Sequence, residues 1–145
     1  MENEAKRQHL EFIQDVITRM NANSFQIKEI SVLLATACFA IYAADKVSLM
    51  LLIPVLPTVI LWCLDTYYLQ QERKFRGIYE DVAGIKNNNI IKPYEMPIQK
   101  YTPDKNIKYG FLNVMRSQTL ILFYLPLIIL SIFLFVFVSY GCMWS

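Results

Sequence analysis

The stretch Leu120-Ile-Leu-Phe-Tyr-Leu-Pro-Leu-Ile-Ile-Leu-Ser-Ile-Phe-Leu-Phe-Val-Phe-Val138 decides the solvent in which this chain folds. It lies within Ser117–Ser145, a segment that carries no charged side chain. The hydrocarbon core of a bilayer takes about 20 apolar residues of helix, whereas a soluble core helix rarely needs more than about a dozen. We therefore predict a transmembrane helix over residues 117–141.

A second uncharged run, Ile30–Ala44, is rich in small side chains. Thr36, Ala40 and Ala44 recur every four residues, a spacing that lets helices approach closely in lipid. Only Asp45-Lys46 separates this run from the next one. Two helices joined by so short a turn must be antiparallel neighbours, so we predict a transmembrane hairpin.

The third uncharged run, Val47–Leu64, contains Pro54 and Pro57. A proline inside a helix removes a backbone donor and bends the helix, so this span is expected to be kinked. Two interpretations of the kink are open: a structural bend, or a hinge that takes part in gating.

The N-terminal segment has the pattern of an amphipathic helix, with one apolar stripe made of Phe12, Ile13, Val16, Ile17 and Met20. The opposite face carries charges of both signs, unlike the Lys-rich face of a typical surface-lying anchor, so docking onto another part of the same assembly is favoured over lying on lipid. His9, the one histidine, is expected to be solvated. Asn21-Ala-Asn-Ser24 is predicted to end this helix, with Asn23 or Ser24 capping the next.

The second span is expected to continue into water as a long helix. Its apolar stripe consists of Leu64, Tyr68, Phe75, Ile78, Tyr79 and Val82. Glu72 and Arg76 form an i,i+4 pair of favourable order on the polar face. Gly84 is predicted to end the helix, and the proline-rich stretch beyond it is predicted as loop, with short strands at Ile90–Ile91 and Ile98–Tyr101.

The fold class is therefore an all-α membrane protein with three transmembrane helices, an N-terminal amphipathic helix and a long cytoplasmic helix extending from the second span. We divide the chain into a cytoplasmic helix over 1–22, a transmembrane hairpin with its helical extension over 25–83 (spans about 28–44 and 47–66), a basic cytoplasmic segment over 84–116, and the third span over 117–141.

Basic residues are distributed unevenly about these spans. Thirteen of the fourteen Lys and Arg residues fall before the first span or between the second and third spans, and only Lys46 lies in the hairpin turn. We call the basic segment over 84–116 the middle segment. The positive-inside rule then predicts that the N-terminus and the middle segment are cytoplasmic, with the C-terminus outside a bacterial inner membrane.

Catalysis finds little support in the sequence. There is no Cys/His pairing, no metal-ligand spacing and no glycine-rich phosphate loop, so we expect no enzyme, no metal and no cofactor. The three cysteines, Cys38, Cys63 and Cys142, suit apolar packing rather than disulfides. No buried ion pair of the kind that a pump would need is expected in the spans.

Three residues are candidates for a pore or its mouth: Thr36, Thr58 and Asp65. Asp65 lies at the cytoplasmic end of the second span. It is either a solvated interfacial residue or part of a carboxylate ring in an oligomeric pore, and such rings favour cations. Three short spans cannot enclose a channel alone, so conduction requires a homo-oligomer.

Basic and aromatic side chains alternate between Lys86 and Arg116, where the net charge is +4. This pattern suits an anionic leaflet surface and also suits single-stranded nucleic acid or a nucleotide messenger. The candidate ligand-binding residues are Lys92, Tyr94, Lys100, Tyr101, Lys105 and Lys108.

Two stretches resemble a group of small bacterial membrane proteins of anti-phage defence, the SLATT type and the transmembrane effector of the Hailong system. They are Arg7-Gln-His-Leu-Glu-Phe-Ile-Gln-Asp-Val-Ile-Thr-Arg-Met-Asn-Ala-Asn-Ser-Phe-Gln-Ile-Lys28 and, after the tight hairpin, Leu64-Asp-Thr-Tyr-Tyr-Leu-Gln-Gln-Glu-Arg-Lys-Phe-Arg-Gly-Ile-Tyr79. The resemblance covers about residues 7–83, and the third span is an addition to the two-span SLATT layout.

The resemblance implies a homo-oligomeric channel, expected to be a tetramer, that stays closed until a signal opens it or releases it from inhibition. It also implies a nucleotidyltransferase-type partner, or its nucleic-acid product, and depolarisation that arrests the infected cell. The alternative is a non-conducting membrane adaptor that recruits a cytosolic protein through the N-terminal helix and the Asp65–Val82 helix.

Overall fold

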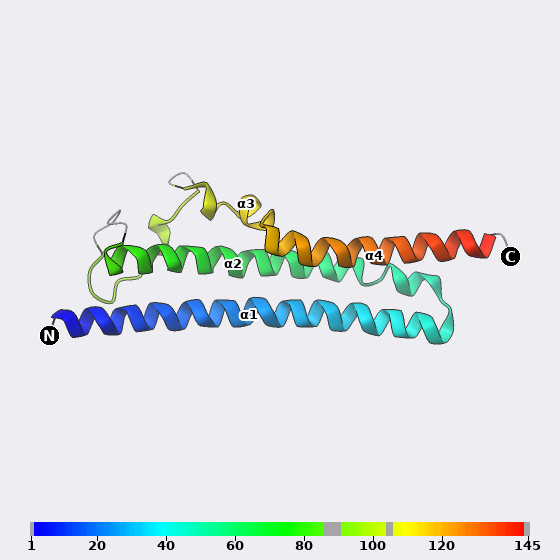
Figure 1. The fold of residues 1–145 in the computed structure, drawn as a ribbon, viewed down its shortest axis with the longest axis horizontal. Helices are drawn as coiled ribbons and strands as arrows, with labels where there is room; N and C mark the ends of the chain where they lie inside the picture. Colours follow the sequence, from blue (N-terminus) through cyan, green and yellow to red (C-terminus); the bar gives the residue numbers. More distant parts are fainter. Residues whose placement is uncertain (1, 86–90, 104–105, 144–145) are drawn as a thin grey trace. The chain divides into compact units, whose positions relative to one another are not determined.

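The computed structural model describes residues 2–85, 91–103 and 106–143, and the described part is helical without strands. The elements in chain order are listed by their bounds: α1 (Glu2–Asp45), the 3-10 helix η1 (Ser48–Leu51), α2 (Val55–Ala83), the 3-10 helices η2 (Ile98–Lys100) and η3 (Ile107–Tyr109), α3 (Phe111–Met115) and α4 (Gln118–Met143). Figure 1 shows their course.

Three stretches of helix are long and apolar enough to span a membrane: Asn3–Asp45, Ser48–Ala83 and Gln118–Tyr140. This confirms the prediction of three helices that are long and apolar enough to cross a membrane. Many large apolar side chains on these helices are exposed in the single chain, Leu33, Leu56 and Leu122 among them. Such a surface requires lipid or other chains to cover it.

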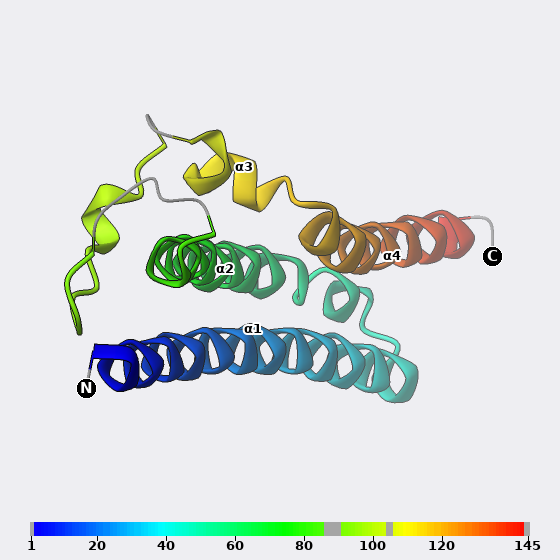
Figure 2. The ribbon, with the colours of Figure 1, turned by 60° about the vertical axis from the view of Figure 1, so that its left-hand side comes forward.

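The chain forms two units. Unit 1 comprises Met1–Ser24 and Thr66–Val114, and unit 2 comprises Phe25–Asp65 and Met115–Ser145. Both α1 and α2 therefore contribute one part to each unit. Within each unit, α1 and α2 run side by side in opposite directions (Figures 1 and 2).

In unit 2 the first span presents one buried seam, made of Ile27, Ser31, Ala35 and Cys38. Their spacing of three and four residues is that of one helix face. Thr36, Ala40 and Ala44 lie on an exposed face instead. The small-residue stripe is thus free of contacts that would bury it within the chain.

The tight hairpin is confirmed. α1 ends at Asp45, and Lys46 adopts a left-handed backbone with φ 58° before η1 begins. A left-handed residue directly after a helix is a common way to reverse the chain.

The predicted proline kink is wrong in its position. Pro54 precedes α2 and Pro57 lies in its first turn, where the backbone N–H groups have no partner within the helix. The span is therefore divided: η1 packs against α4, a turn follows, and a new helix starts at Val55.

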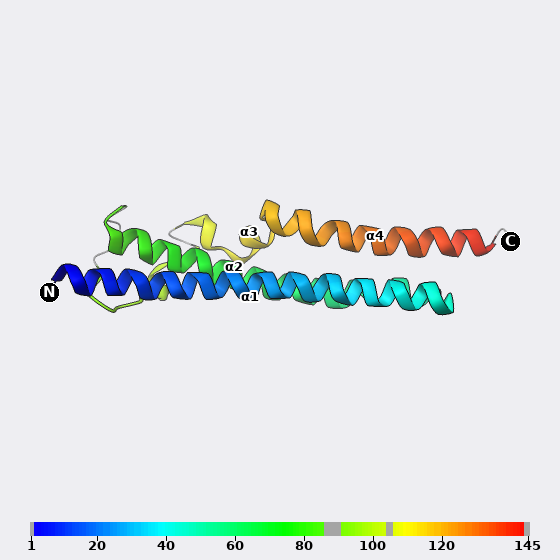
Figure 3. The ribbon, with the colours of Figure 1, turned by 60° about the horizontal axis from the view of Figure 1, so that its bottom comes forward.

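The predicted break at Asn21–Ser24 is also wrong, because α1 continues through it without interruption (Figure 3). Ser24 and Ile27 are both buried, so the buried face of the helix continues past the residues that were predicted to cap it. Burial of that face outweighs the weaker preference of asparagine and serine for helix ends.

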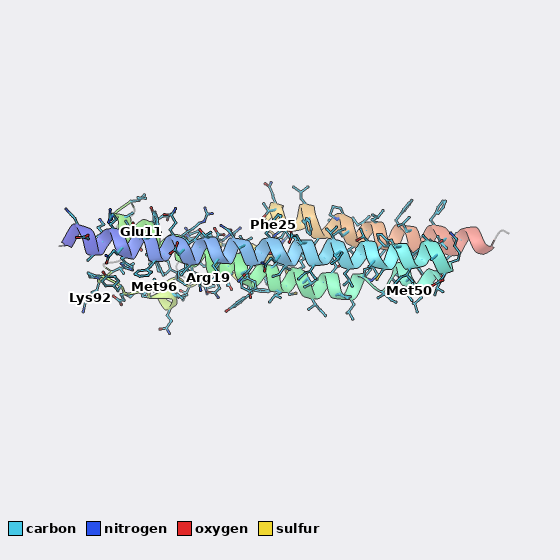
Figure 4. The ribbon with its side chains drawn as sticks, turned by 90° about the horizontal axis from the view of Figure 1, so that it is seen from below. Glu11, Arg19, Phe25, Met50, Lys92 and Met96 are labelled. Atoms are coloured by element: carbon cyan, nitrogen blue, oxygen red, sulfur yellow. The ribbon has the colours of Figure 1, made fainter. Side chains whose placement is uncertain are left out.

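Unit 1 is built around a core of Ile13 from α1, Phe75 and Ile78 from α2, and Tyr101 and Tyr109 from the middle segment. The N-terminal helix thus docks onto another part of the same chain. Figure 4 shows Lys92 and Met96 beside this part of α1, and Met96 packs against the core.

The end of α2 agrees with the prediction made from the sequence. α2 reaches Ala83, Gly84 follows with φ 81°, and Arg76 donates to Glu72 as predicted. The predicted strand over Ile98–Tyr101 is wrong, because residues 98–100 form η2. The other predicted strand involves Ile90, which lies outside the described residues.

Candidate functional site

A buried carboxylate joins all three spans of unit 2. Asp65 of α2 is 0% exposed, and its Oδ2 atom accepts hydrogen bonds from Lys28 Nζ of α1 at 2.6 Å and from Tyr124 Oη of α4 at 2.9 Å. We call these three residues the polar cluster. Because one oxygen accepts both bonds, Asp65 is the centre through which α1 and α4 are linked.

Aromatic packing supports the polar cluster. The Trp62 ring, one turn before Asp65 on α2, stacks on the Tyr124 ring with centroids 5.9 Å apart and planes 12° apart. Tyr124 is also fully buried. A charge removed from water in this way requires a partner of opposite charge and further hydrogen bonds, which the polar cluster supplies.

The polar cluster corrects the expectation that the spans hold no buried ion pair, and it excludes a solvated Asp65 in this conformation. One signal in the sequence could have found the pair. Lys28 lies 18 residues before Lys46 and Asp65 lies 19 residues after it. Two residues at nearly equal distances from a tight hairpin turn lie opposite each other. The contribution of Tyr124 has no comparable signal.

The other two pore candidates have different surroundings. Thr58 is buried in the first turns of α2, and its backbone N–H bonds Pro54 O at 3.0 Å. Thr36 is exposed, and its hydroxyl donates to the carbonyl oxygens of Val32 and Leu33 in its own helix. Its hydroxyl is therefore satisfied without an ion or water.

Thr36 also lines an open groove of about 800 Å³ in unit 2. The lining is mostly apolar and comes from α1 together with Phe123 of α4. Lys28 and Glu29 contribute its charged groups. The groove therefore adjoins the polar cluster through Lys28.

In unit 1, one of the candidate ligand-binding residues, Tyr101, belongs to the core. Tyr101 is buried and donates a 2.7 Å hydrogen bond to Asp81 Oδ2, and its ring meets Tyr109 edge-on. A Cβ on Gly77 would lie 2.5 Å from Tyr109 Oη and 2.7 Å from the Tyr101 ring. Glycine at this helical position lets both tyrosines reach α2, so Tyr101 offers no free ring for stacking.

Backbone acceptors complete the attachment of the middle segment to α2. Gln70 Nε2 donates to Tyr109 O at 2.7 Å, and Arg73 Nη1 donates to Lys108 O at 3.3 Å. Lys108 Nζ lies 4.9 Å from the centre of the Tyr109 ring, a cation–π contact. The described stretches around Tyr101 and around Lys108 and Tyr109 are therefore folded onto the helix.

The remaining candidates lie nearer the surface. Lys92 and Tyr94 are exposed, and Tyr94 Oη donates to Gln8 Oε1 at 2.8 Å. Lys100 is half-exposed and lies 3.8 Å from Glu95. Lys105 lies outside the described residues. Lys92, Tyr94 and Lys100 thus remain accessible to a ligand, whereas Tyr101 does not.

His9 corrects a further expectation. It is 1% exposed rather than solvated, its ring lies 6.0 Å from that of Tyr94, and its Nε2 has no hydrogen-bond partner among the described residues. Within the same described part, no three His, Cys, Asp or Glu side chains are grouped to hold a metal ion.

Comparison with known proteins adds no relative to this description. No family model matches the chain, and no curated protein or solved structure matches it either.

Proposed function

We propose that this chain is a homo-oligomeric channel of the bacterial inner membrane that acts as an effector in anti-phage defence. A nucleotide or nucleic-acid signal on unit 1 opens the channel or releases it from inhibition, and the membrane is depolarised. Unit 1 lies in the cytoplasm and the C-terminus lies outside, as the distribution of basic residues favours.

The observation that supports this proposal is that α1 and α2 each contribute to both units. Both helices supply the core of unit 1, through Ile13 and through Phe75 and Ile78. The same two helices supply candidate spans of unit 2. A ligand that displaces the middle segment from Asp81 therefore acts on helices that also span the membrane.

Oligomerisation follows from size and from surface. Three spans cannot enclose an aqueous path, so a pore requires several copies around a symmetry axis. The exposed face with Thr36, Ala40 and Ala44 is suited to close helix packing between copies, and a tetramer is the expected assembly.

The alternative function, a non-conducting adaptor, depends on an apolar face of α2 that a cytosolic protein would bind. Phe75 and Ile78 are the large residues of that face, and both are buried against α1 and the middle segment. A partner would have to displace the core of unit 1 to reach them. The channel is therefore the better-supported function.

The test is to reconstitute the purified chain in planar bilayers and measure conductance before and after adding short DNA oligomers or the product of a neighbouring nucleotidyltransferase. We expect ligand-dependent conductance from an oligomer. A Lys92→Ala/Lys100→Ala variant should weaken the response, whereas Lys6→Ala, which removes an exposed charge elsewhere in unit 1, should not. A monomer that never conducts, with or without ligand, overturns the proposal.

A further inference from the structure

We propose that the polar cluster of Lys28, Asp65 and Tyr124 is the latch that holds the three spans in the closed arrangement, and that separating it opens the pore. This inference rests on the proposed channel function and assigns its regulation to three named side chains. Closed, the latch is an ion pair with a hydroxyl donor bound to the same carboxylate oxygen.

The first argument is connectivity. Asp65 Oδ2 receives Lys28 from α1 and Tyr124 from α4, so a single oxygen fixes the positions of three helices. Removing the carboxylate releases both neighbours. Removing the Tyr124 hydroxyl releases α4 alone and leaves the ion pair between α1 and α2.

The second argument is electrostatic. As a pair, Lys28 and Asp65 present no net charge to the apolar surroundings of unit 2. Separated, they become an ammonium and a carboxylate that each require water, because an unpaired charge in such surroundings is costly. The unlatched state is therefore stable only when water reaches both groups. A hydrated path between spans is also what ion conduction needs.

The third argument is position along the chain. Lys28 lies shortly after Phe25, where α1 enters unit 2, and Asp65 is the last residue of α2 before unit 1 resumes at Thr66. The latch thus lies on the two helices that continue into the ligand-binding unit. A shift of either helix along its axis changes the Lys28–Asp65 distance directly.

The experiment compares single and compensating substitutions in reconstituted bilayers without ligand. Lys28→Met and Asp65→Asn each leave one group without its charged partner, and we expect open probability to rise roughly 10-fold or more. The double variant Lys28→Met/Asp65→Leu removes both charges, and the exchange Lys28→Asp/Asp65→Lys restores a pair. The exchange should return toward wild-type closure, whereas the double variant, which still lacks the acceptor of Tyr124, should return only to the level of Tyr124→Phe.

Matched controls separate the latch from general damage. Glu29→Gln removes an exposed carboxylate beside Lys28, and Tyr140→Phe removes an exposed hydroxyl from α4. Neither should change open probability, whereas Tyr124→Phe should raise it less than Asp65→Asn does. Single variants that stay closed, in a preparation whose wild-type chain conducts when triggered, overturn the latch and leave the channel function standing.

A second readout does not depend on conduction. The Trp62 ring stacks on Tyr124, so its fluorescence reports the cluster once Trp144 is replaced by Phe. Emission should shift to the red in both single variants and return in the compensating pair. An unchanged spectrum in every variant overturns the latch.

If even the triggered wild-type chain carries no current, the proposed channel function fails, whatever the Trp62 fluorescence shows. Size-exclusion chromatography of each variant identifies any that fail to fold, and the compensating pair then decides.

Discussion

The hydroxyl of Tyr101 donates a 2.7 Å hydrogen bond to Asp81, and both side chains are buried in unit 1. The two residues lie 20 positions apart, on the middle segment and on α2. This contact fastens a segment with no long helix of its own to a helix that also contributes to unit 2.

Tyr101→Phe removes the donor and leaves the carboxylate with less compensation for its burial. We expect a loss of about 1–3 kcal/mol in the free energy of unfolding of unit 1. Urea titration in detergent, with protease cleavage of the middle segment as the probe, measures it. Tyr94→Phe is the control, since Tyr94 is exposed, and a loss of equal size there would contradict this role of Tyr101.

Gly77→Ala tests the close approach of the two tyrosines to α2. In a free helix alanine would be favoured by about 1 kcal/mol over glycine. Here the added Cβ overlaps Tyr109 Oη and the Tyr101 ring, so unit 1 should become less stable instead. Combining it with Tyr109→Phe removes the nearest atom and should recover part of the loss. A melting temperature that rises in Gly77→Ala would show that the tyrosines pack elsewhere.

The substitutions Ile13→Ala and Phe12→Ala test which of two neighbouring residues in the predicted apolar stripe contributes to stability. Ile13 is 0% exposed in the core of unit 1, and its truncation should cost about 2–5 kcal/mol. Phe12 is 53% exposed, and its truncation should cost less than about 1 kcal/mol. Thermal unfolding of the two variants side by side gives the comparison, and equal losses would place the N-terminal helix in a different register.

The contacts of unit 1 also predict which segments lie on the same side of a membrane. Gln8 and Tyr94 share a hydrogen bond, so their segments must lie on the same side of a membrane. In a cysteine-free background, Glu11→Cys and Lys92→Cys should react with an impermeant maleimide from one side, and Lys46→Cys from the other. Labelling of the first two from opposite sides would be incompatible with unit 1.

The sequence predicted features that depend on local pattern. Uncharged runs identified three candidate spans, Gly84 marked the end of α2, and the Glu72–Arg76 spacing identified a real pair. Each depends on residues close in the chain or on total hydrophobicity. The structure of such features follows from helix geometry and the cost of exposing apolar surface.

The errors concern distant contacts. The predicted stripe of the N-terminal helix included exposed Phe12 and omitted buried His9, because its register is set by α2 and the middle segment. Glu72 was expected on a polar face and is buried. The polar cluster was missed for the same reason. Tyr124 lies 59 residues from Asp65, and no local sequence pattern predicts their contact.

Unit 1 has a consequence for biosynthesis. The residues that close it on Gln8 are 86 positions further along the chain. At a synthesis rate of about 5–20 residues per second, the N-terminal helix waits on the order of ten seconds for Tyr94, and meanwhile two spans are made. Unit 1 is thus completed only after both candidate spans of the hairpin have been synthesised. Until Phe75, Ile78, Tyr101 and Tyr109 have been made, Ile13 has no core to enter, so the N-terminal part of α1 depends on the last part of unit 1 for its burial.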